Sequence, residues 1–275
     1  YIKVLNLMSS KSNKSDKNLK KLLKDGYVVI DNLISKKECE KIKKITGKIY
    51  LKYSKNTKIK NPLEETIYNL HNKHSIFLKY INYKKTINLV KDALSVGSYS
   101  NSDDIIIRQS AMRNPLKGYA QQLHNDTRVV GCKFPLIIQV IYMIDDFTKK
   151  NGATRLVPKS HLLNYYAKNN KVYKNEKIIT GKRGSALILN ASMWHGSAKK
   201  TNEEDRWGMI YSYSRWFLKS SFNFNLNTPY KIFKKLKKEE KKLMGFNSNP
   251  PKDEFSRSSA KSKKPEIPTN YYLPS

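Results

Sequence analysis

Two histidines and an aspartate in the middle of the chain are well suited to hold a metal ion. His124 and Asp126 stand two positions apart, so both side chains project from one face of an extended strand. His195 follows after 68 further residues. Two imidazoles and one carboxylate form the ligand face on which non-haem Fe(II) keeps open coordination positions. The three residues therefore predict an iron site.

This ligand set also limits the chemistry. Three protein ligands leave enough room on an octahedral iron for a bidentate 2-oxo acid and one oxygen molecule. A histidine and an aspartate in this spacing are also common as an ordinary polar pair on a strand. The surrounding segments must therefore decide between the two interpretations.

Several segments around these residues carry a recognisable pattern. They are Leu22–Glu38, Met112–Asp126, Asp145–His161, Gly181–Asn190 and Trp194–Ser197, followed by Arg206. Together they resemble the phytanoyl-CoA dioxygenase family of Fe(II)- and 2-oxoglutarate-dependent oxygenases. The resemblance spans roughly Leu19 to Phe217 and departs at Lys159, where the family usually has glycine before Ser-His.

The resemblance implies roles for five residues. His124, Asp126 and His195 would bind Fe(II), with 2-oxoglutarate and O2 as cosubstrates. Arg206 would bind the distal carboxylate of 2-oxoglutarate, because a guanidinium offers paired donors to a planar anion. Ser197 would add a hydroxyl donor. The alternative for Arg206 is a surface position in its Asn-Glu-Glu-Asp-Arg turn, since turns are rich in exposed charge.

Two polar residues precede the ligands on one predicted strand. Gln109 and Arg113 stand four positions apart, so alternation places them on one face together with Ala111. We expect both to contact cosubstrate or substrate. The alternative is that Arg113 only lines the mouth of the barrel.

The other histidines are given no chemical role. His161 closes a predicted turn, where a histidine more often caps or packs than binds a metal. His71 and His74 fall in a polar stretch between two apolar runs.

The pattern from Asp104 onward predicts a mainly β fold. Short apolar runs alternate there with clusters of Gly, Pro, Asn and Asp. A double-stranded β-helix, the cupin-like jelly roll, closes two sheets around a cavity and lets distant ligands converge. The expected strands are Ile105–Met112, Gln121–Arg128, Phe134–Ile144, Thr154–Pro158, Lys177–Thr180, Ser185–Leu189, Ser192–Ala198 and Trp207–Phe217.

The N-terminal part predicts helices that buttress this core. Ser35 is a plausible N-cap because Glu38 follows three residues later, and that helix is expected to run to about Tyr53. The other expected elements are helices at Asn18–Asp25, Leu63–Leu70 and Ile76–Val96 and a strand at Tyr27–Ile30.

We expect one domain with two polar flanks. Residues 1–18 form a polar lead-in, residues 19–217 the dioxygenase domain with a jelly-roll core over about 104–217, and residues 218–275 a Lys-rich region. In the last part Lys231–Phe246 predicts one amphipathic helix with Ile232, Phe233, Leu236 and Leu243 as its apolar stripe. A loose arm is expected after Asn247.

The net charge of +32 raises the question of nucleic-acid binding. Only eight of the 54 basic residues are arginine, and the lysines are spread over every segment. Nucleic-acid readers usually cluster their charge and favour arginine. We therefore expect no more than non-specific electrostatic binding, together with a pocket biased towards anions.

The remaining composition indicates a soluble protein of a reducing compartment. Cys39 and Cys132 are the only cysteines, which favours the cytoplasm over a disulfide framework. The longest apolar run, Phe134 to Ile144, is interrupted by Gln139 and is too short to span a membrane. The first residues are too short and too polar for a secretory signal.

Three classes of function follow. The leading hypothesis is an oxygenase that hydroxylates a small molecule or acyl derivative. The second is an oxidative nucleic-acid demethylase with the same cofactors, although Arg206 and Arg215 are spaced differently from that family's arginine pair. The third is a non-catalytic binding protein on the same fold. A radical halogenase is disfavoured, because it would replace Asp126 with a small residue.

Overall fold

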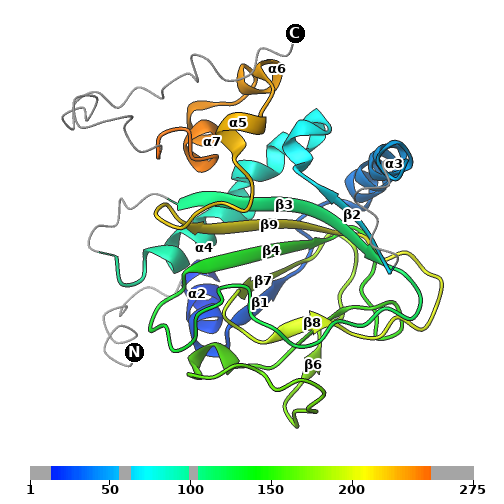
Figure 1. Cartoon of the computed structure of the whole chain (residues 1–275), viewed down its shortest axis with the longest axis vertical. Coiled ribbons are helices and arrows are strands. Elements are labelled where there is room, and N and C mark those ends of the chain that lie inside the picture. The colour runs from blue at the N-terminus through cyan, green and yellow to red at the C-terminus, as the bar shows by residue number, and fades with distance from the viewer. Residues whose placement is uncertain (1–13, 56–62, 99–104, 249–275) are drawn as a thin grey trace.

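Two antiparallel sheets face each other across a cavity in the computed structural model, which describes residues 14–55, 63–98 and 105–248. The larger sheet has the strand order β1-β7-β4-β9-β3-β2 and the smaller one the order β6-β5-β8 (Figure 1). This is the predicted jelly-roll core. The strands are β1 Tyr27–Ile30, β2 Glu64–Tyr68, β3 Ile105–Pro115, β4 Ile137–Met143, β5 Thr154–Leu156, β6 Lys177–Ile178, β7 Ala186–Asn190, β8 His195–Ser197 and β9 Gly208–Arg215.

Helices cover one face of the larger sheet, and the smaller sheet lies on the other side (Figure 1). Ser35 caps α3 as predicted, because its Oγ accepts a hydrogen bond from the backbone N–H of Glu38 at 3.2 Å. The helices are α2 Lys14–Asp25, α3 Lys36–Tyr53, α4 Lys84–Ser95, α5 Phe224–Asn227, α6 Tyr230–Phe233 and α7 Lys238–Leu243, with 3-10 turns η2 Leu70–Asn72, η3 Ser75–Asn82 and η4 Ser160–Leu162.

The two faces of the larger sheet differ in character. On β4, Ile138, Val140 and Tyr142 belong to the main apolar core beneath the helices. Gln139 and Ile141, which alternate with them, line the cavity. Since side chains alternate along a strand, each strand contributes to the core and to the cavity at once.

The prediction of a strand over Gln121–Arg128 is wrong. This segment has a single isolated bridge to β8, between His124 and His195, and one further hydrogen bond from the N–H of Gln121 to the carbonyl of Ser197 at 3.1 Å. The pairing ends because Asn125 folds the chain back, with its side-chain oxygen accepting the N–H of Arg128 at 3.2 Å and Arg128 at a φ of 54°.

The helical prediction over Leu63–Leu70 is also wrong. Residues 64–68 form β2, which pairs with β3 and places Ile67 opposite Met112 in the core. The free edge of β3 decides the conformation here, because strand preference depends on the neighbouring strand. The predicted helix over Ile76–Val96 is divided at Tyr83 into η3 and α4.

The chain ends differ from the predicted flanks. Helix α2 already begins at Lys14, inside the predicted lead-in, and the rest of that lead-in lies outside the described residues. The predicted C-terminal helix is divided between α6 and α7, preceded by the short α5, and the predicted arm after Asn247 lies almost entirely outside the described residues. The apolar stripe is buried as expected, and Phe224, Phe233 and Phe246 join the main core. Within the described ranges no helix is long and apolar enough to cross a membrane.

Candidate metal centre

A single backbone bridge brings the two predicted histidine ligands together. The N–H of His124 donates to the carbonyl of His195 at 3.0 Å, and the N–H of His195 donates back at 2.9 Å. Their ring centroids lie 4.5 Å apart. Gly196 makes this approach possible, because a Cβ there would lie 2.7 Å from the carbonyl oxygen of Gln121.

Both imidazoles are held with the same nitrogen free. Nδ1 of His124 lies 3.0 Å from the carbonyl oxygen of Gln122, and Nδ1 of His195 lies 2.8 Å from that of Met193. A carbonyl only accepts, so each Nδ1 carries the proton and each Nε2 keeps its lone pair. The hydrogen bond from each Nδ1 to a backbone carbonyl fixes the tautomer and the orientation of the ring, as metal-binding histidines require.

The Asp126 carboxylate lies between the two free nitrogens. Its oxygens are 3.4 Å from Nε2 of His124 and 3.6 Å from Nε2 of His195, and the Gln139 amide donates to it from β4. Burial alone would raise the pKa of Asp126. When the two histidines are protonated instead of binding a metal, their hydrogen bonds and positive charge outweigh burial and hold that pKa well below its usual range.

The donor set fits an iron ion. One ligand atom from each of the three residues lies within 4.8 Å of the others. Two neutral imidazoles and one carboxylate are the ligands that suit Fe(II) with open positions. The structure thus brings the three predicted ligands together without any rearrangement of the backbone.

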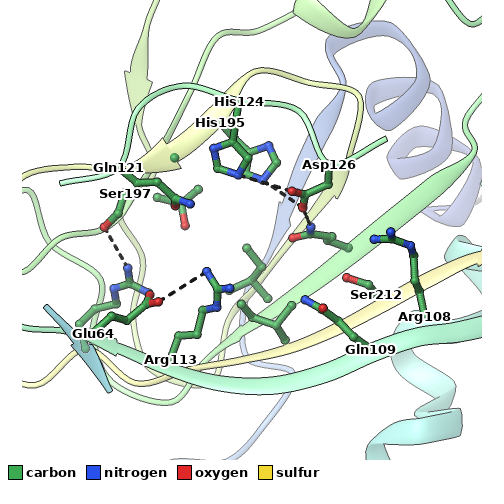
Figure 2. A pocket seen from close by; sticks show the side chains of 16 residues that line it. Glu64, Arg108, Gln109, Arg113, Gln121, His124, Asp126, His195, Ser197 and Ser212 are labelled. Atoms are coloured by element: carbon green, nitrogen blue, oxygen red, sulfur yellow. Dashed lines mark hydrogen bonds and ion pairs between the residues drawn. The ribbon is translucent and has the colours of Figure 1, made fainter. Parts of the chain in front are cut away.

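The three ligands open onto a cavity of about 300 Å³ between the two sheets (Figure 2). Gln139, Ile141, Ile210 and Ser212 from the larger sheet form one wall. Thr154, Gly196 and Ser197 from the smaller sheet form the other. The predicted residues Gln109, Arg113 and Arg206 line the cavity as well.

Arg206 is a buried cation without an ion pair in the described part of the chain. Its side chain donates to the carbonyl of Gly152 at 2.5 Å and lies over the Phe147 ring at 4.6 Å, and its Nε has no partner there. Burial lowers the pKa of Arg206 to about 10. A buried charge is costly unless a counterion compensates it, so this geometry indicates an anion site and excludes the alternative surface position.

Ser197 supports Arg206. Its Oγ donates to the carbonyl of Gly152 at 2.9 Å and accepts from Arg206 at 3.4 Å. The hydroxyl proton is therefore already engaged, and Ser197 would have to release Gly152 before it could donate to a cosubstrate as predicted.

Arg113 is compensated within the protein. Its guanidinium lies 3.7 Å from the carboxylate of buried Glu64 and donates to the Tyr68 hydroxyl at 3.4 Å. Arg113 therefore supports the cavity wall, while the uncompensated charge at this end is that of Arg206. His161 lies away from the cavity, with its Nε2 3.0 Å from the carbonyl oxygen of Leu23.

Several of the cavity residues were not predicted from the sequence, and Glu64, Gln139 and Arg108 are the most informative of them. Glu64 lies in the segment that the sequence predicts to be helical, and Gln139 is the polar interruption of an apolar run. Arg108 enters the cavity because β3 is irregular at this residue. The isolated polar residue within Phe134–Ile144 was the one signal that could have identified Gln139.

Comparison with known proteins gives a family-level match. The model of the family described as phytanoyl-CoA dioxygenase (PhyH) matches residues 22–208, more than half of the chain. An uncharacterized protein of Mycobacterium tuberculosis, Rv1501, is 24% identical over 106 residues, which are 38% of this chain and 39% of that protein. The dioxygenase cdmA of Talaromyces verruculosus is 26% identical over 138 residues, 47% of this chain and 46% of that protein.

Solved structures show the same fold. HygX from Streptomyces hygroscopicus, crystallised with nickel, 2-oxoglutarate and hygromycin B, superposes with a TM-score of 0.63 at 14% identity. The superposition covers 74% of this chain and 88% of HygX. The sequence matches above, by contrast, span less than half of the curated relatives' length.

Proposed function

Because the chain belongs to the phytanoyl-CoA dioxygenase family, we propose that it is an Fe(II)- and 2-oxoglutarate-dependent oxygenase that hydroxylates a small organic molecule or acyl derivative. One observation carries the proposal. Three preorganised ligands line the same cavity as the buried Arg206, which has no ion pair with any described residue.

His124, Asp126 and His195 would hold the metal. The carbonyls of Gln122 and Met193 keep Nε2 of each imidazole turned towards it, and Gln139 fixes the carboxylate. Iron bound there would couple oxidative decarboxylation of 2-oxoglutarate to substrate oxidation, with one oxygen atom entering a C–H bond and the other succinate. Because these contacts hold the three ligand side chains in place before the metal binds, the free-energy cost of binding it is lower.

Arg206 would bind the distal carboxylate of 2-oxoglutarate. Its Nε, which has no partner in the described part of the chain, is a donor for that anion, whereas Nη2 is already engaged by Gly152 and Ser197. Ile141 and Ile210 form an apolar part of the wall, which excludes water and strengthens the charge pair. Proteins of related sequence or fold support this proposal, since cdmA is a dioxygenase and HygX was crystallised with 2-oxoglutarate.

The cellular setting is proposed on simpler grounds. The two free cysteines, Cys39 and Cys132, favour the cytoplasm.

Any binding to DNA should be weak, independent of sequence and steeply weakened by salt, because it would rest on phosphate contacts alone. Turnover of methylated DNA or RNA would instead support the nucleic-acid demethylase hypothesis.

The test is a spectroscopic titration without oxygen, followed by turnover. Fe(II) and then 2-oxoglutarate are added, and the visible charge-transfer absorption of a 2-oxo acid chelated to Fe(II) is recorded. We expect the band for the wild type and for Glu203→Ala, an exposed control at 78% side-chain exposure, but not for Asp126→Ala. When air is admitted, succinate should form. A compound that increases the rate of succinate formation is then identified as a substrate. Absence of the band in the wild type would reject the proposal.

A further inference from the structure

Strand β3 contains a bulge that changes which side chains reach the cavity. Ile107 pairs with Tyr213 and Gln109 with Ser212, so Arg108 has no residue opposite it on β9. Before the bulge Ile105 and Ile107 point into the helix-covered core. After it, Gln109 and Arg113 line the cavity, although they would share the face of Ile107 in a regular strand.

The bulge also brings a second arginine to the cavity wall. Arg108 and Gln109 are adjacent in sequence, yet both line the cavity. Figure 2 shows them with Ser212 on one side of the histidine pair, while Glu64, Arg113 and Ser197 lie on the other side. The hydrogen bond from Arg206 to Ser197 places Arg206 on that second side. The cavity thus has an arginine at each of its two ends.

The charges around the cavity show what Arg108 lacks. Arg113 is neutralised by Glu64. Under the proposed function, Asp126 and the 2-oxo acid carboxylate balance Fe(II), and Arg206 balances the distal carboxylate. Arg108, which is half-buried, forms no hydrogen bond or ion pair through its side chain with any residue of the described ranges. Among the described residues, one positive charge at the cavity therefore remains without a partner once metal and cosubstrate are bound.

We propose that Arg108, with Gln109 and Ser212 beside it, binds an anionic group of the organic substrate, a carboxylate or a phosphate ester. The proposal rests on the proposed function, because only a bound 2-oxoglutarate assigns Arg206 to the cosubstrate. A guanidinium offers paired donors to either anion, and the amide and hydroxyl can satisfy its remaining oxygens. A substrate anchored there would approach the metal from the side opposite the cosubstrate, so the oxidised carbon lies away from the anion.

The test measures binding and not turnover. Protein loaded with Ni(II) and saturated with 2-oxoglutarate is inert and has Arg206 occupied. Calorimetry then compares hexanoate with hexanamide, and hexyl phosphate with hexanol, so that each anion has an uncharged counterpart and the two arms separate carboxylate from phosphate. We expect at least one anion to bind about ten- to a hundredfold more tightly than its counterpart.

Matched variants assign that preference to a residue. Arg108→Gln should remove it while leaving hexanamide, hexanol and 2-oxoglutarate affinities unchanged, and Arg108→Lys should restore part of it. Arg183→Gln, a surface arginine that pairs with Asp146 and Glu40, should keep the full preference.

The outcomes separate this inference from the proposed function. If the metal-loaded wild type does not bind 2-oxoglutarate, the proposed function itself is rejected. If 2-oxoglutarate binds, the inference is overturned when neither anion is preferred or when the preference survives in Arg108→Gln.

Discussion

The two faces of β4 are made by one backbone segment, yet they serve opposite requirements. Ile138, Val140 and Tyr142 are packed under the helices, and the Tyr142 hydroxyl is satisfied by Thr86 at 2.7 Å. Gln139 and Ile141, between them, face the cavity. The helix side is built for stability, whereas the cavity side holds polar groups whose partners come from metal, cosubstrate or substrate.

This difference has an energetic consequence. A buried apolar side chain stabilises the fold by about 1.5–3 kcal/mol. Arg206, a buried cation with no ion pair in the described ranges, does the reverse until an anion binds. Substitutions on the helix side should therefore reduce stability, and substitutions on the cavity side should reduce ligand binding.

Arg206→Ala should give the largest effect on binding among the arginines. Removing one partner of a charge-assisted pair in a partly dry cavity costs about 2–5 kcal/mol, so the apparent constant for 2-oxoglutarate should rise tens to thousands of fold. Arg206→Lys should recover part of it. Stability should not fall, since a poorly compensated charge is removed. The measurement is succinate formation against 2-oxoglutarate, with Fe(II) affinity as control.

An unchanged titration curve for Arg206→Ala would move the clamp to Arg113. Arg215 is not an alternative, because its guanidinium is held away from the cavity. It donates to the carbonyl of Pro135 at 3.0 Å and to Ser98 Oγ at 2.8 Å.

Matched truncations on β4 compare the two faces directly. Ile138→Ala should lower the free energy of unfolding by about 2–5 kcal/mol, because it leaves a void in a fully buried core. Ile141→Ala should cost less, because it enlarges a cavity that already exists. Urea unfolding checks both. Equal losses would mean that the cavity wall is as tightly packed as the core.

Acid should destabilise the helix-covered side of the larger sheet through His71. Burial lowers the pKa of His71 to about 3, below the usual 6.5, so the unfolded chain binds a proton that the folded chain excludes. The free energy of unfolding is therefore highest above pH 6.5. It should fall by about 1.4 kcal/mol per pH unit as the pH falls from 6.5 towards 3.

His71→Phe should flatten this dependence in urea unfolding at pH 7 and pH 5. His161, whose pKa burial also lowers, keeps a residual slope. An unchanged slope in His71→Phe would show that this histidine is not the titrating group.

Lys159→Gly should have the smallest effect, a gain of about 0.5–1 kcal/mol. Lys159 is exposed and lies at a φ of 66°, a left-handed conformation that costs little for glycine. Its N–H donates to the carbonyl of Asp25 in either case, at 3.0 Å. Thermal unfolding decides this, and a loss of stability would mean that the lysine side chain itself stabilises the turn.

The sequence was most informative where a residue's own neighbours decide its structure. The apolar runs predicted β4, β7 and β9, and Ser35 with Glu38 predicted the start of α3. The family and fold followed from motifs that lie within short segments. The ligands could be predicted because their chemical types and spacing are themselves the signal.

Features set by pairing between distant segments were missed. β2 depends on the edge of β3, and the bulge at Arg108 depends on its register with β9. In the sequence this region is a continuous apolar run followed by polar residues, so no local signal marked Arg108. The contact of Gln139 with Asp126 likewise requires two segments to meet.

Iron binding by the purified protein tests the central claim most directly. Anaerobic titration should give one Fe(II) per chain for the wild type and for His74→Ala, an exposed histidine outside the cavity. Asp126→Ala and His195→Ala should lose most of that affinity, since each removes one of three ligands. Full iron binding by both variants would contradict the assignment of the metal centre.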